Sequence, residues 1–120
     1  MYKVSFYIDA NGKSEIFDLL EKLKISKSKD ARVNRNKILL YIKLLEEYGV
    51  LIGEPICKHL EGEIYELRPL KNRILFFYHE KDQYILLTHF VKKTDKTPKF
   101  EIEKKKKKMN EYLLRKLNQW

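Results

Sequence analysis

Several familiar sources of protein chemistry are missing from this 120-residue chain. Its one cysteine, Cys57, can form no internal disulfide and cannot build a cysteine zinc site. The chain also has no glycine-rich phosphate loop, no paired-histidine zinc motif and no nucleophile elbow. We therefore expect neither a metal nor a cofactor, and any catalysis has to use residues outside these motifs.

Long apolar segments are missing as well. The N-terminal sequence, MYKVSFYIDANG, contains no apolar core of signal-peptide length. No apolar run approaches the roughly 18 residues that a membrane-spanning helix needs. The sequence therefore predicts a cytoplasmic protein that is neither secreted nor embedded in a membrane.

Acidic residues are scarce relative to basic ones. Asp and Glu number 17 against 26 Lys and Arg, so the formal net charge is +9. This excess favours a partner that is a nucleic acid, an acidic protein, or both. Hydrophobic residues make up 43% of the chain, which is too apolar for a disordered protein. The length suits a single domain over residues 1–120.

Three consecutive strand patterns organise the second half of the chain. The first, Glu63–Arg68, alternates between two faces, and the other two, Arg73–His79 and Tyr84–Val91, are rich in aliphatic and aromatic residues. Polar residues 80–83 are enough for a tight hairpin between the last two. We expect an antiparallel meander that packs one face on helices and leaves the other accessible.

Helical patterns lie on both sides of this meander. Apolar spacing predicts helices over Ser14–Lys27, over Ala31–Tyr48 with a stop at Gly49, and over Pro98–Asn118. Residues 3–8 read as a short strand at the sheet edge, and residues 50–60 read as a loop. The last helix has an apolar seam that includes Leu117 and Trp120. The order β-α-α-β-β-β-α groups its helices, which is typical of the α+β class.

Basic residues recur at the strand ends, where they suggest a phosphate-rich partner. Arg68, Arg73 and one lysine of the Lys92–Lys93 pair should lie on the accessible face. Together they could hold an RNA phosphate while the ribose 2′-hydroxyl attacks in line, because arginine offers a two-pronged fork for the developing charge. Glu66 and His89 are the candidates for proton transfer.

Each of these residues also has a purely structural interpretation. Arg68 and Arg73 could be solvated strand-end charges that pair with Glu66 and Glu63, since cross-strand ion pairs are common and weak. His89 lies in an apolar strand, where a histidine is more often hydrogen-bonded core than catalyst.

A second group of residues is predicted to contact RNA outside the reacting phosphate. It consists of the tyrosines Tyr65 and Tyr78 and of Lys104, Lys105 and Lys108 from a run of lysines over 104–108. On a helix, consecutive lysines point in every direction, so some must lie near the packed face and the rest form a basic surface. The alternatives are a packing role for Tyr65, which shares a face with Leu67, and an ordinary solvated helix for the lysines.

At these positions the sequence resembles the RelE/ParE superfamily of toxins, and more closely the HigB-like, phage-derived branch of type II toxin–antitoxin systems. The resemblance covers nearly the whole chain and rests on the following segments: Tyr65–Arg68, Arg73–Tyr78, His89–Lys93, Thr97–Pro98 and Glu101–Ile102.

The resemblance implies a RelE-like toxin that cleaves translated mRNA in the ribosomal A site without a metal. It implies Arg68, Arg73, Lys92 and Lys93 as site residues, and Glu66 stands where RelE itself has a lysine. It also implies neutralisation by a HigA-like helix-turn-helix antitoxin, in an expected heterotetramer that touches operator DNA only through the antitoxin. Two other functions stay open, a ParE-like gyrase inhibitor and a non-catalytic basic nucleic-acid-binding module.

Overall fold

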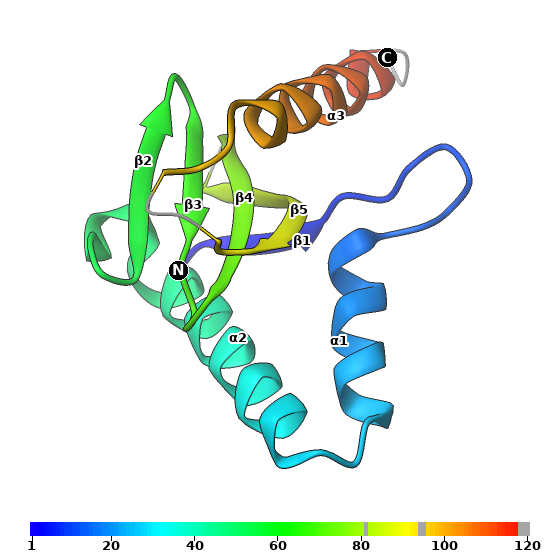
Figure 1. The fold of residues 1–120 in the computed structure, drawn as a ribbon. Helices are drawn as coiled ribbons and strands as arrows, with labels where there is room; N and C mark the ends of the chain where they lie inside the picture. Colours follow the sequence, from blue (N-terminus) through cyan, green and yellow to red (C-terminus); the bar gives the residue numbers. More distant parts are fainter. Residues whose placement is uncertain (81, 94–95, 118–120) are drawn as a thin grey trace.

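A five-stranded sheet forms the centre of the protein in the computed structural model, which describes residues 1–80, 82–93 and 96–117. The strand order is β1-β5-β4-β3-β2 (Figure 1). The strands are β1 (Lys3–Phe6), β2 (Cys57–Glu61), β3 (Ile64–Leu67), β4 (Asn72–His79) and β5 (Gln83–Val91). β1 runs parallel to β5 at one edge, and all other neighbours are antiparallel. The α+β class and the edge position of the first strand are as the sequence predicts.

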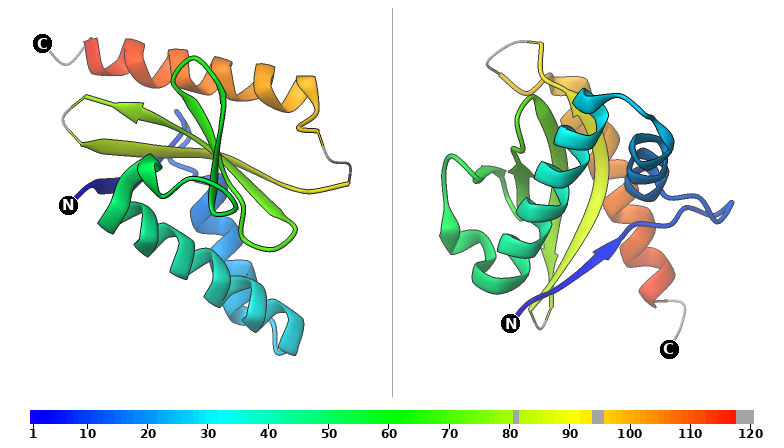
Figure 2. Two further views of the ribbon diagram at one scale, coloured as in Figure 1. Left: turned by 90° about the vertical axis from the view of Figure 1, so that its left-hand side faces the viewer. Right: turned by 90° about the horizontal axis from the view of Figure 1, so that it is seen from below.

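Helices cover both faces of this sheet. α1 (Glu15–Ile25) and α2 (Lys29–Tyr48) diverge from a short connection and lie on one face, while α3 (Lys99–Leu117) lies across the other (Figures 1 and 2). The larger core joins Ile16, Ile38 and Leu45 of the helical hairpin to Ile74 and Phe76 of β4. The smaller core lies beneath α3, where Tyr7, Phe77, Ile85 and Leu87 pack against Met109, Tyr112 and Leu113. Among the described residues, no helix is long and apolar enough to cross a membrane.

Local sequence explains where the first two helices begin and end. The Ser14 hydroxyl accepts a hydrogen bond from the Phe17 amide at 3.2 Å, and the Ser28 hydroxyl accepts one from the Ala31 amide at 3.0 Å. α2 stops at Gly49, whose φ of +64° is in the region that favours glycine. A Cβ added to Gly49 would lie 2.6 Å from the Tyr2 ring, so this position also needs glycine to let the N-terminus pack.

The expectation of a loop over residues 50–60 is wrong. Residues 49–52 form a 3-10 turn, η1 (Gly49–Ile52), and β2 follows as an extra strand that pairs with β3. Only Cys57 of β2 is fully buried, so this edge strand carries little of the apolar alternation that marks a strand in a sequence. Its pairing comes from backbone hydrogen bonds, which are independent of side-chain pattern.

The expectation of one open sheet face is wrong as well. α3 and its apolar seam cover the face opposite the helical hairpin, and α3 begins at Lys99. Arg73, expected on an accessible surface, is only 6% exposed. Trp120 lies outside the described residues. Any ligand that approaches the sheet on this side therefore has to do so at its margins.

Candidate functional site

Three charged residues predicted from the sequence meet at the start of β4. The Glu66 Oε1 atom lies 3.4 Å from Arg68 Nε and 3.8 Å from Arg73 Nε, so one carboxylate is shared by two guanidinium groups. Glu66 and Arg73 are buried, while the Arg68 side chain is 20% exposed. The cluster carries one net positive charge, and Arg68 is its solvent-exposed member.

Strand geometry explains why these residues share a face. Phe77 of β4 faces α3, and Arg73, four residues earlier on the same strand, points in the same direction. Glu66 pairs in register with Leu75, two residues from Arg73, and therefore also points away from the helical hairpin. Tyr65 and Leu67 point the other way, into the larger core, as the alternation predicts.

Backbone and hydroxyl groups hold this cluster. The Thr97 hydroxyl donates a hydrogen bond of 2.6 Å to Glu66 Oε2, and one Arg73 nitrogen donates to the carbonyls of Leu70 and Asn72 at 2.9 and 2.8 Å. Burial, supported by the charge of Arg68, lowers the pKa of Arg73. The site is therefore preorganised before any ligand arrives, which is how proteins prepare electrostatic stabilisation of a developing charge.

Arg68 is the member of the cluster that is best placed to exchange partners. Its terminal nitrogen lies 3.3 Å from the exposed carboxylate of Glu54, and exposed pairs of this kind contribute roughly 0–1 kcal/mol. Its Nε atom is buried and makes no hydrogen bond within the described part of the chain. A phosphate group could replace Glu54 at a small cost in free energy and would accept two hydrogen bonds from the Arg68 guanidinium group.

The sheet separates His89 from this cluster. β4 and β5 shift register between Leu75 and Phe76, so an extra residue of β5, Leu87, is accommodated there. After this bulge His89 pairs with Ile74 and points toward the helical hairpin. Its Nε2 atom lies 2.8 Å from Asn72 Oδ1, and burial lowers its pKa. His89 therefore cannot act on a group held by Arg68 and Arg73 on the opposite face.

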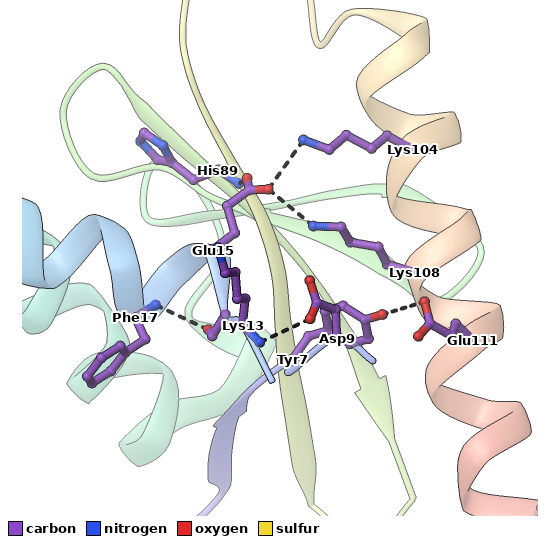
Figure 3. A network of polar contacts seen from close by, with 10 residues as sticks. Tyr7, Asp9, Lys13, Glu15, Phe17, His89, Lys104, Lys108 and Glu111 are labelled. Carbon is purple, nitrogen blue, oxygen red and sulfur yellow. Dashed lines mark hydrogen bonds and ion pairs between the residues drawn. The ribbon is translucent and has the colours of Figure 1, made fainter. Parts of the chain in front are cut away.

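Two of the lysines predicted to bind RNA are held instead by Glu15. Lys104 and Lys108 lie 3.3 and 3.1 Å from Glu15 Oε1, and the His89 amide donates to Glu15 Oε2 at 2.6 Å (Figure 3). Glu15 thus joins α1, β5 and α3. Burial alone would raise its pKa, but the His89 amide and both lysines outweigh that effect, and the net pKa is lowered.

The remaining predicted residues are spread over the molecule. Lys105 is fully buried, so its side chain cannot contact RNA in this structure.

Tyr65 stacks on Phe76 with ring centroids 5.7 Å apart, and Tyr78 is 37% exposed. Tyr65 and Tyr78 both line a hollow of about 280 Å³ near the β4–β5 turn. Lys93 is exposed, and Lys92 donates its backbone amide to the Lys71 carbonyl at 2.7 Å.

Sequence reasoning missed three partners of the site. Glu54 lies in the segment that the sequence predicts to be a loop, and no sequence pattern singles out Thr97 or Glu15 as a contact of these groups. All three are far along the chain from the groups they contact, so no local pattern could reveal them. The only indication of these partners in the sequence is the number of predicted site cations, because a buried or half-buried cation requires an acidic or carbonyl partner.

Comparisons with known proteins bear on the family and the fold of the chain. The sequence model of a family described as "Phage derived protein Gp49-like (DUF891)" matches residues 14–110. No curated protein sequence matches the chain. Among solved structures, the fold is similar to a chain in the crystal structure of the archaeal RelE–RelB complex from Pyrococcus horikoshii OT3. That match has a TM-score of 0.52 and 18% identity, and it covers 75% of this chain and 93% of the other.

Proposed function

Because the chain belongs to the Gp49-like family of phage-derived proteins, and because its fold is similar to that of RelE, we propose that it is the toxin of a toxin–antitoxin pair. Its proposed activity is that of a HigB-like, ribosome-dependent endoribonuclease that cuts translated mRNA without a metal. The observation that carries this proposal is the pairing of Arg68 and Arg73 around the buried carboxylate of Glu66.

The proposed reaction uses RNA as its own nucleophile. The ribose 2′-oxygen attacks the adjacent phosphorus, a bond forms between them, and the bond from phosphorus to the 5′-oxygen breaks. The 2′-hydroxyl loses its proton to a base, and the leaving 5′-oxygen gains one. Arg68 and Arg73 stabilise the extra negative charge on the phosphate oxygens in the transition state. Glu66 holds both guanidinium groups in place and is the candidate base for the proton, because its carboxylate lies between them.

The test is primer extension on a reporter mRNA after brief induction in cells that lack the antitoxin. We expect cuts at codon-phased positions with the wild-type protein, only while the message is translated. Arg68→Ala should lower cleavage by about 100-fold, in the range for loss of one preorganised donor. Arg73→Lys keeps the charge but loses the fork, so it should also cut poorly.

Lys43→Ala is the matched control, because Lys43 is an exposed cation of α2 on the other side of the sheet. It should cut as well as the wild type. Growth arrest with intact message would contradict the nuclease and favour a gyrase or another protein target. Tight, salt-dependent RNA binding without growth arrest would favour a simple nucleic-acid-binding module.

The same proposal includes an antitoxin. RelE was solved together with RelB, and this chain has an excess of nine positive charges that an acidic or amphipathic partner segment would balance. We propose a HigA-like helix-turn-helix partner that forms a heterotetramer when it dimerises. Co-purification with the protein encoded by the neighbouring gene, followed by measurement of the complex mass, tests this partner directly.

A further inference from the structure

A small basic hollow lies where α1 meets α2. Its volume is about 210 Å³, and four cations from three consecutive segments surround it: Lys24 at the end of α1, Lys27 in the connection, and Arg32 and Arg35 on α2. The Ser26 and Ser28 hydroxyl groups also line it, and no carboxylate does. We call these four cations and two serines the turn cluster.

None of the four cations forms an ion pair with an acid among the residues that the structure describes. The Nε atom of Arg35 is buried there and has no hydrogen-bond partner either. A group of like charges around one hollow repels itself, and a half-buried guanidinium without a partner is costly. The repulsion among the four cations is relieved when an anion enters the hollow.

The lysine run of α3 contrasts with this cluster. Lys104 and Lys108 pair with Glu15, Lys106 lies 3.2 Å from Glu61, and Lys105 is buried. Although the run is the most basic stretch of the sequence, most of its charge is already used inside the protein. The turn cluster has fewer cations, but its charge is available to a partner.

From this contrast we propose that the turn cluster is a binding surface for the phosphodiester backbone of a structured RNA. The surface is distinct from the Glu66, Arg68 and Arg73 cluster and does not depend on the proposed nuclease activity. Arginine, lysine and serine are the side chains that most often hold backbone phosphates, and they do so without reading sequence. An acidic protein segment is the other anion to consider, but an amphipathic helix needs apolar area to dock, and Leu23 is the single apolar residue of this lining.

The hollow is connected to the start of β4. Asn34, beside Arg35, accepts a hydrogen bond of 2.8 Å from the Asn72 side chain, and Asn72 precedes Arg73. The bond ties α2 to the strand that carries the candidate site. An RNA backbone held at the turn would therefore have a fixed position relative to Arg73, which makes this surface suited to orient a large RNA.

The experiment measures binding of the purified protein to a labelled RNA duplex by fluorescence anisotropy over a series of salt concentrations. The test variant is Lys24→Gln/Lys27→Gln/Arg32→Gln, which leaves the half-buried Arg35 in place. The control variant is Lys3→Gln/Lys13→Gln/Lys43→Gln, which removes the same charge from exposed positions elsewhere. Circular dichroism confirms that both variants fold.

We expect the test variant to bind more weakly, with a slope of log affinity against log salt that is smaller by about two to three. The control variant should keep the wild-type slope. Equal slopes in the two variants would overturn the proposal, since they would mean that only net charge matters. A polyglutamate peptide serves as a second probe. If the test variant loses binding to this peptide but binds RNA as the wild type does, the proposal is overturned in favour of an acidic protein partner.

This outcome is separable from the proposed nuclease. If Arg68→Ala still cuts mRNA but the turn variant loses RNA binding, the nuclease site is wrong and the binding surface stands. If Arg68→Ala abolishes cutting while the turn variant binds RNA normally, the binding surface is wrong and the nuclease stands.

Discussion

Lys105 shows how costly one charged residue can be inside a small protein. Lys105 is a residue of α3 whose side chain is fully buried, and its ammonium group makes no hydrogen bond within the described residues. Burial lowers its pKa from 10.5 to about 8, against the opposing attraction of Glu61 and Glu103. A shift of that size corresponds to on the order of 3 kcal/mol against the charged form. The protein thus carries this cost at neutral pH.

Replacing Lys105 with methionine should therefore stabilise the fold. Between about pH 8 and 10.5 the unfolded chain holds more protons on Lys105 than the folded one, so its contribution to stability rises with pH across that window. Lys105→Met should raise the free energy of unfolding by about 1–3 kcal/mol at pH 7, and its advantage should shrink toward pH 10. Urea unfolding at both pH values measures this. A variant less stable than wild type at pH 7 would mean that Lys105 has a partner in solution.

Single residues of the candidate site could be predicted only in part. Strand alternation correctly placed Glu66, Arg68 and Arg73 on one face, because side chains alternate strictly along β3 and β4. The same alternation along β5 would place the His89 side chain on the α3 face, together with Leu87. The bulge at Leu87 turns His89 to the opposite face. A bulge depends on how two strands pair rather than on local sequence, so the sequence does not reveal it.

At the scale of elements, Glu15 is the residue that holds three of them together. It contacts the β5 backbone through the His89 amide and α3 through Lys104 and Lys108, while it begins α1 (Figure 3). Besides these contacts, α3 packs on a small apolar core, Tyr7 donates a hydrogen bond to Glu111, and Lys106 pairs with Glu61 of β2. The attachment of α3 therefore depends on this carboxylate as well as on apolar contact.

Glu15→Gln should loosen α3. Since the folded pKa of Glu15 is lowered, its charge contributes stability above the unfolded value of 4.5, and that contribution is lost as pH falls through the folded pKa. We expect a loss on the order of 1 kcal/mol at pH 7 and a vanishing difference from wild type in strong acid. Hydrogen exchange of α3 amides measures the loosening. Glu47→Gln, an exposed acid of α2, is the control and should exchange like wild type.

Elements with strong periodicity were predictable, and elements without it were not. α1 and α2 follow from spaced leucine and isoleucine residues with serine caps, and α2 ends at the glycine that the sequence marks. β2 was missed because an edge strand needs backbone partners more than apolar side chains. The position of α3 over the sheet was missed because an amphipathic seam shows that a helix packs, but not on which surface.

At the scale of the whole molecule, charge is distributed unevenly between its two ends. The acids Glu15, Glu61 and Glu103 neutralise much of the lysine run on α3. The cations at the turn between α1 and α2, by contrast, form no ion pair with any acid in the described part of the chain. A cluster of like charges favours association with polyanions, and it destabilises the folded state because the charges repel one another. A surface kept for binding is therefore expected to cost stability in the free protein.

That cost can be measured with Lys27→Gln/Arg32→Gln. Both cations lie near the positive N-terminal end of α2, where a positive charge is unfavourable, and both face the same hollow. The variant should be more stable than wild type by on the order of 1 kcal/mol at low ionic strength, and the gap should close as salt screens the repulsion. Thermal unfolding over a salt series measures it, with Lys13→Gln/Lys43→Gln as the control for lost net charge. If the variant were less stable than the wild type at every salt concentration, Lys27 and Arg32 would stabilise the fold. The cations of the turn cluster would then not destabilise the free protein by repelling one another.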